Sequence, residues 1–149
     1  GEFGGDEREV VEDHEPGALW VQMRLWTQAR QQGQWAGQCM TGMSKYFPSP
    51  LEIFGHATRF LGYKVVLLGL YNGQTLPVGD GRTKVYVRST PGKEYVRVIL
   101  RDGRMVGAVL LGETDLEETL ENLMLNRLDL SPFGAHLLDP DIDLADYFD

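Results

Sequence analysis

Two strand-like segments joined by a two-residue turn limit the folds open to this chain more than any other feature. The segments Glu94–Arg101 and Arg104–Leu111 are rich in β-branched and other apolar side chains, which suit a pleated and buried surface. Asp102 and Gly103 lie between them. This pair of residues tolerates the positive φ angles of a type I′ turn. The sequence therefore predicts an antiparallel β-hairpin, around which the rest of the fold must be built.

Further strands are expected before the hairpin. Residues 63–70 form an apolar run typical of a central strand, and residues 83–89 form another strand, with Val85 and Val87 on one side. Prolines at positions 48 and 50 interrupt the chain and mark the point after which strands begin. The sequence thus predicts an antiparallel sheet of about four or five strands.

A long helix is expected before the sheet, from about Leu19 to Met43. Apolar residues recur there at helical spacing and form one stripe: Val21, Leu25, Ala29, Ala36, Met40 and Met43. Gly33 and Gly37 lie beside the stripe, and each glycine weakens a helix by up to about 1 kcal/mol relative to alanine. Close packing against another backbone or a ligand would compensate. We therefore expect this chain to be the C-terminal part of a larger protein.

Helical signals return after the hairpin. Residues 114–117 (Thr-Asp-Leu-Glu) match a capping box, and the helix that follows carries apolar residues on one face: Leu116, Leu120, Leu123 and Met124. Ser131 and Pro132 predict a cap and a first-turn proline for a short helix toward Leu138. An antiparallel sheet with helices on one side belongs to the α+β class.

Composition excludes several classes of function. The 149 residues, 42% of them apolar, suffice for one core of ordinary size. A net charge of −8 disfavours direct binding to nucleic acid or to anionic membranes. No apolar run approaches the roughly 20 residues of a membrane-spanning helix. Cys39 is the single cysteine, so it forms no internal disulfide, and we expect it to be a small buried side chain.

The remaining chemical candidates have simpler explanations. His14, His56 and His136 lack any neighbouring arrangement of catalytic groups, and together with one cysteine they provide no metal site. The tail, residues 139–149, holds five aspartates at a spacing that imitates a calcium loop but lacks its glycine and its final carboxylate. A solvated acidic tail is the better interpretation of these residues. Its apolar residues could instead dock onto the body or onto a partner: Ile142, Leu144, Tyr147 and Phe148.

The start of the chain resembles a flavin site. Residues 3–6 (Phe-Gly-Gly-Asp) resemble the second flavin motif of the class I pyridine nucleotide-disulfide oxidoreductases, and residues 25–33 look like the final helix of the FAD domain in that family. The resemblance extends over nearly the whole chain, including residues 22–30, 63–69, 103–119 and 137–149. It implies that residues 1–47 are the C-terminal end of an FAD-binding domain, that residues 48–138 form a C-terminal α+β domain, and that residues 139–149 form an acidic tail.

The resemblance also implies which residues bind the cofactor. Gly5 and Asp6 would contact the ribityl and phosphate region of FAD. The backbone around Gln22, Met23 and Arg24 would face the pyrimidine edge of the flavin, where the positive end of the helix dipole favours the reduced, anionic ring. The remainder of the FAD site and the NAD(P)H site would lie upstream, so the fragment alone is not expected to be active.

The implied parent is an FAD-dependent, NAD(P)H-using oxidoreductase of the oxidative stress response, located in nucleus and cytoplasm and, in muscle, at the sarcomere. The disulfide reductases of the family carry a His-Pro-Thr motif in the C-terminal domain, and this chain has none. A conventional disulfide reductase is therefore disfavoured, and the electron acceptor stays open. The alternative is a non-catalytic interaction module that binds a protein partner through its sheet and its acidic-aromatic tail.

Overall fold

The computed structural model describes residues 19–142 and 144, and the fold is built from a five-stranded sheet and four helical segments within that part of the chain. The strands are β1 (Gly55–Phe60), β2 (Tyr63–Gly69), β3 (Thr83–Thr90), β4 (Glu94–Arg101) and β5 (Arg104–Leu111). The helical segments are α1 (Trp26–Met40), η1 (Ser44–Tyr46), α2 (Glu117–Leu125) and η2 (Ser131–Leu138). The expected α+β class is therefore compatible with the structure.

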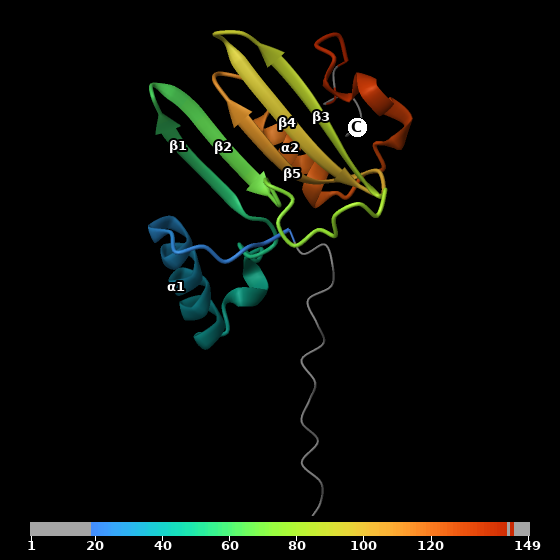
Figure 1. The fold of residues 1–149 in the computed structure, drawn as a ribbon. Helices are drawn as coiled ribbons and strands as arrows, with labels where there is room; N and C mark the ends of the chain where they lie inside the picture. The colour runs from blue at the N-terminus through green and yellow to red at the C-terminus, as the bar shows by residue number, and fades with distance from the viewer. Residues whose placement is uncertain (1–18, 143, 145–149) are drawn as a thin grey trace, which may run out of the picture.

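All neighbouring strands of the sheet are antiparallel, in the order β1-β2-β5-β4-β3 (Figure 1). The predicted hairpin of β4 and β5 is confirmed, and both of its turn residues have positive φ, 51° at Asp102 and 78° at Gly103. The predicted strands at residues 63–70 and 83–89 are also present, as β2 and β3. The middle position belongs to β5, whereas β2 lies one place away from the edge.

The core lies between one face of the sheet and α2. Alternate residues of β4, including Val96 and Val98, are fully buried, and Ala108 and Leu110 of β5 lie opposite them in register. Helix α2 covers these residues with three side chains that are also fully buried: Leu120, Leu123 and Met124. This confirms the apolar face predicted for the helix, although Leu116 is only partly buried.

The other face of the sheet is not covered by α2 (Figure 1). Val85 and Val87 lie on this face, as their spacing predicted, and are 47% and 54% exposed. A shallow hollow of about 210 Å³ opens between β2, the end of β5 and the turn between β3 and β4; its apolar lining includes Phe60, Tyr63, Val65, Tyr95 and Leu111. The sheet therefore has one sealed face and one apolar face that is partly open.

Strand β1 was not recognised in the sequence. Its burial pattern is almost entirely exposed, because it forms the edge of the sheet and pairs only with β2. An exposed edge strand needs no alternation of apolar and polar residues, so the sequence gives little indication of it.

Helix α1 is shorter than predicted. It begins at Trp26 and ends at Met40, and residues 19–25 precede it in a non-helical conformation. The predicted apolar stripe is not buried either: Met40 is 82% exposed, and Gln28 is the one buried residue of the helix. The helix lies apart from the sheet (Figure 1) and has its main contacts with η1. Of the predicted stripe, Val21 packs against the core, from the non-helical segment that precedes the helix.

The predicted capping box is wrong. Leu116 occupies the N-cap position of α2 with no side-chain cap, and Asp115 has a φ of 53°, which breaks the geometry that a capping box requires. The hydroxyl of Thr114 is buried without a partner in the described residues. Glu117 reaches across to β2 instead, where its carboxylate lies 2.5 Å from the ammonium group of Lys64. Glu117 thus forms an ion pair between α2 and β2 instead of the predicted cap.

The short helix predicted after Ser131 is present as the 3-10 segment η2, with Pro132 in its first turn. The predicted cap at Ser131 is wrong, because Ser131 is the first residue of the segment and Leu130 is the N-cap residue. The N–H of Ser131 donates to the carboxylate of Asp129 at 3.0 Å. Gly134 has a φ of 53° and divides the segment in two. Beyond η2, Leu144 is 5% exposed and Ile142 packs against the core. These two tail residues dock onto the body, whereas Tyr147 and Phe148 are outside the described residues.

Candidate functional site

The residues predicted to bind the flavin fall in two parts of the chain. Gly5 and Asp6 lie outside the described residues. Gln22, Met23 and Arg24 lie in the non-helical segment that leads into α1, and all three are exposed. They therefore remain candidates for contact with a ligand, but they do not form the first turn of the helix.

A buried side chain fixes this leading segment. Gln28 is 5% exposed, and its amide nitrogen Nε2 donates to the carbonyl oxygen of Val21 at 2.6 Å. Its Oε1 accepts the N–H of Met23, also at 2.6 Å. The amide thus satisfies two backbone groups at once and folds residues 21–23 against the start of α1. Nothing in the sequence distinguished Gln28 from the other polar residues of this helix.

Among residues 19–142, no side chain caps the N-terminus of α1. Leu25 is the N-cap residue, and the first helical hydrogen bond runs from the N–H of Ala29 to the carbonyl of Leu25 at 3.0 Å. The N–H groups of Trp26, Thr27 and Gln28 have no acceptor within the described residues. Free donors at the positive end of a helix dipole favour an anionic group nearby. The first turn of the helix is thus formed by residues 26–28, which follow the predicted residues 22–24.

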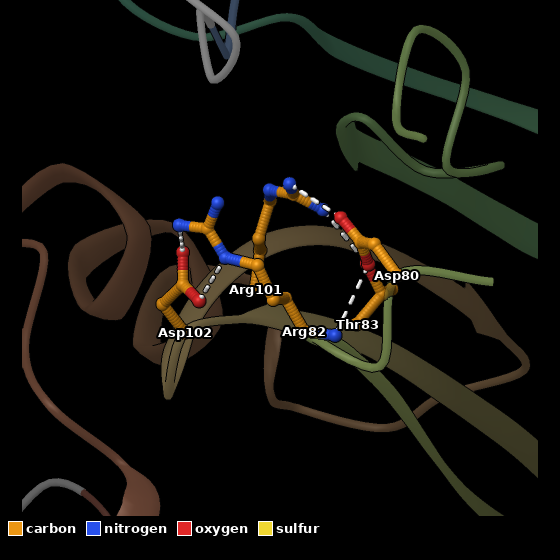
Figure 2. A network of polar contacts seen from close by, with 5 residues as sticks. All are labelled: Asp80, Arg82, Thr83, Arg101 and Asp102. Carbon is orange, nitrogen blue, oxygen red and sulfur yellow. Dashed lines mark hydrogen bonds and ion pairs between the residues drawn. The ribbon is translucent and has the colours of Figure 1, made fainter. Parts of the chain in front are cut away.

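A second polar arrangement lies at the tip of the β4–β5 hairpin (Figure 2). The guanidinium of Arg82 binds the carboxylate of Asp102 through two hydrogen bonds, of 2.7 and 2.5 Å. Arg101 binds Asp80 at 2.8 Å and the hydroxyl of Thr83 at 3.2 Å. These pairs join the loop before β3 to the end of β4. The sequence analysis missed them, because the partners are about 20 residues apart and only the strand register brings them together.

The two carboxylates are held in their charged form. The hydrogen bond from Arg101 is the main reason that the pKa of Asp80 lies below its usual value, and the N–H of Arg82 adds to it. The hydrogen bond from Arg82 likewise lowers the pKa of Asp102. A short loop and a hairpin turn are thereby fixed by charge-assisted bonds, which are the stronger class of hydrogen bond.

The remaining candidates in the described part of the chain form no assembled catalytic group, and His14 lies outside that part. His136 lies 2.7 Å from the carboxylate of Asp139, but both side chains are largely exposed. Cys39 is exposed, so the prediction of a buried thiol is wrong, because α1 does not pack onto the sheet. Among the described residues no group of three or more histidine, cysteine, aspartate or glutamate side chains could hold a metal ion. The same part of the chain contains no helix long and apolar enough to cross a membrane.

Comparison with known proteins supports the resemblance seen in the sequence. Residues 73–128 match the family described as the Rubredoxin NAD+ reductase C-terminal domain, which covers the region from the loop before β3 to the end of α2. The match therefore includes the hairpin, the polar pairs at its tip and the helix that covers the sheet.

Longer similarities extend over most of the chain. It is 54% identical over 139 residues to pyridine nucleotide-disulfide oxidoreductase domain-containing protein 1 of Mus musculus, which covers 91% of this chain and 27% of that protein. The proteins of the same name from Homo sapiens and Drosophila melanogaster are each 53% identical and cover 88% and 90% of the chain. The chain is thus similar to a C-terminal part of these domain-containing proteins and spans about a quarter of their length.

Proposed function

We propose that this chain is the C-terminal portion of an FAD-dependent oxidoreductase that uses NAD(P)H, and that the complete protein acts in the oxidative stress response. The observation that carries the proposal is the identity of 54% over 91% of the chain with a protein named pyridine nucleotide-disulfide oxidoreductase domain-containing protein 1. In this proposal residues 1–47 end the FAD-binding domain, residues 48–138 form the C-terminal domain, and residues 139–149 form its tail. The complete protein is located in nucleus and cytoplasm, and at the sarcomere in muscle.

The N-terminus of α1 fits one part of a flavin site. FAD would supply hydride and electron transfer when bound, and its pyrimidine edge carries negative charge when the ring is reduced. The N–H groups of residues 26–28, which have no acceptor among residues 19–142, are suited to that edge, and the bonds with Gln28 hold residues 21–23 next to them. Gly5 and Asp6 are assigned to the ribityl and phosphate region by resemblance. NAD(P)H is assigned to the region upstream.

The exposed apolar surface of the chain supports packing against an FAD domain. Trp26 is 85% exposed and Met40 is 82% exposed on α1, and the open face of the sheet adds Phe60 at 67%. Large apolar side chains exposed on a folded domain are candidates for contact with a partner surface. Because the related proteins are about four times longer than the chain, their other domains are the natural occupants of these surfaces.

Expression of the complete reading frame tests the proposal. The full-length protein should purify with the visible absorbance of bound flavin and should be bleached by NADH or NADPH. The variant Gln28→Ala should retain less flavin than the wild type, because residues 21–23 lose their anchor, whereas Gln34→Ala, an exposed glutamine of the same helix, should not. A colourless but well-folded full-length protein would contradict the flavin assignment.

The fragment gives a second test. The 149 residues lack the adenosine part of the proposed site, so titration with FAD should show weak binding only. Tight, stoichiometric binding of FAD to the fragment would overturn the assignment of the rest of the site to the upstream region.

The interaction-module alternative keeps one supporting observation, the partly open apolar face of the sheet. It predicts that the fragment and a colourless full-length protein would capture the same protein partner. Flavin in the purified full-length protein decides against it as the sole function.

A further inference from the structure

A pocket lined by four arginines lies at the hairpin tip, on the side of the molecule where the described chain begins. Its volume is about 210 Å³, and the arginines come from three regions: Arg82 from the loop before β3, Arg101 and Arg104 from the hairpin, and Arg127 from the end of α2. These four are among only 14 basic residues in a chain with a net charge of −8. This cluster of positive charge differs in sign from the net charge of the protein, so a local function is a reasonable explanation for it.

The four arginines are not equally engaged. Arg82 and Arg101 are each paired with a carboxylate, Asp102 and Asp80 respectively (Figure 2). Arg101 is the more enclosed of these two, with a side chain that is 9% exposed. The pairs form one rigid, nearly neutral wall of the pocket.

The other two arginines, Arg104 and Arg127, form no ion pair within the part of the chain that the structure describes. The Nε of Arg104 donates to the carbonyl oxygen of Arg127 at 3.0 Å, which leaves its terminal amino groups without a partner in the described residues. The guanidinium of Arg127 has no partner there either. Hydrogen bonds from Ser131 are the main reason that the pKa of Asp129 is lowered, and the charge of Arg104 adds to this effect. The pocket thus offers donors from two separate guanidiniums that form no ion pair with any carboxylate of residues 19–142.

We propose that this pocket binds the phosphate group of a small phosphorylated molecule. A phosphate monoester presents three strong acceptor oxygens and a charge of about −2 at pH 7, so it can bridge two guanidiniums. A carboxylate has only two acceptor oxygens in one plane and suits a single guanidinium, as Asp102 shows with Arg82.

The walls and the size of the pocket define the rest of the ligand. Leu19, Met105 and Val106 also line the pocket, and all three are buried apolar residues. They can contact a small apolar group attached to the phosphate. Pockets for drug-sized ligands enclose roughly 300–1,000 Å³. This pocket is smaller, so it accommodates a phosphate and a short substituent rather than a complete dinucleotide. The proposal does not depend on the flavin assignment.

Titration of the 149-residue chain with inorganic phosphate and with phenyl phosphate tests the proposal, followed by NMR of the backbone amides. Both probes should shift the amides of residues 102–104 and 127 saturably, and phenyl phosphate should bind more tightly because of the apolar wall. The affinity should fall as the salt concentration rises, since charged donors form the site.

Three variants give the test its specificity. Arg127→Gln should weaken binding of phenyl phosphate about tenfold, the scale of one lost charge-assisted bond, and should leave the fold intact because its guanidinium has no partner in the described residues. Arg104→Gln should have a similar effect. Arg59→Gln is the matched control, because Arg59 is an exposed arginine on the distant strand β1.

Three outcomes would overturn the proposal. The first is the absence of saturable shifts with either probe in the wild-type chain. The second is an equal loss of affinity in Arg59→Gln, which would indicate an unspecific charge effect. The third is binding of an acidic peptide at the same amides when neither phosphate probe binds, which would assign the pocket to a carboxylate-bearing partner.

Discussion

Two regions of the molecule, the sheet with α2 and the N-terminal helix α1, differ in how their apolar side chains are buried. In the first region the apolar side chains of β4, β5 and α2 bury one another, and Val96, Leu120 and Leu123 have no exposed surface at all. In the second, Trp26 and Met40 are more than four-fifths exposed. Apolar spacing in a sequence therefore indicates that a helix needs a partner, but it does not say whether the same segment of chain supplies one.

The difference has a direct energetic meaning. An isolated helix of about 12–15 residues is marginal in water even with a favourable sequence. Helix α1 has 15 residues, including two glycines, and its buried anchor is the amide of Gln28 rather than an apolar side chain. We therefore expect α1 to open locally at much lower free energy than the sheet, whose strands share one continuous core.

The largest effect should come from a cavity in the shared core. Leu123→Ala removes a fully buried side chain that packs between α2 and the sheet, and such substitutions cost about 2–5 kcal/mol. Urea unfolding followed by circular dichroism measures the loss. Leu125→Ala on the same helix is the control, because Leu125 is 39% exposed and should cost much less. Equal losses in the two variants would show that α2 does not close the core in the way the structure describes.

Two glycines test the comparison, because replacing each with alanine should change stability in opposite directions in the two regions. A Cβ on Gly107 of β5 would overlap the backbone of Leu70, so Gly107→Ala should destabilise by about 1–3 kcal/mol. A Cβ on Gly33 of α1 would meet no atom within 4 Å. Gly33→Ala should therefore stabilise α1 by up to about 1 kcal/mol. Amide hydrogen exchange resolved by residue would detect both changes, and a destabilised α1 in Gly33→Ala would contradict the open surroundings of that residue.

The parts that the sequence predicted correctly depend on local signals. The hairpin was predicted because Asp102 and Gly103 accept positive φ, and that requirement lies within two residues. The errors arose where distant residues decide the outcome. Glu117 was expected to cap its own helix, but it pairs with Lys64, more than 50 positions earlier. The arginine pocket was missed for the same reason, since three separate regions supply its side chains.

Acid should weaken the hairpin tip. The pKa values of Asp80 and Asp102 are lowered in the folded state by hydrogen bonds from Arg101 and Arg82. Their contribution is therefore complete above the ordinary aspartate pKa of about 3.9 and is lost as the pH falls through the lower folded values. The double variant D80N/D102N should be somewhat less stable at pH 7 and should lose less stability on acidification than the wild type. Parallel pH profiles of the two proteins would rule out this contribution, which is modest because both pairs are partly exposed.

The smallest effect should follow from the most exposed aromatic residue. Trp26 is 85% exposed, so Trp26→Ser should change the unfolding free energy of the 149-residue chain by no more than about 0.5 kcal/mol. In the full-length protein the same substitution should cost clearly more, because we propose that the rest of the FAD domain covers this face of α1. Urea unfolding of both proteins, with and without the substitution, measures the difference. An equally small effect in both would mean that the exposed face of α1 stays exposed in the complete protein, and the contrast between a self-sufficient sheet and a dependent helix would then require another partner.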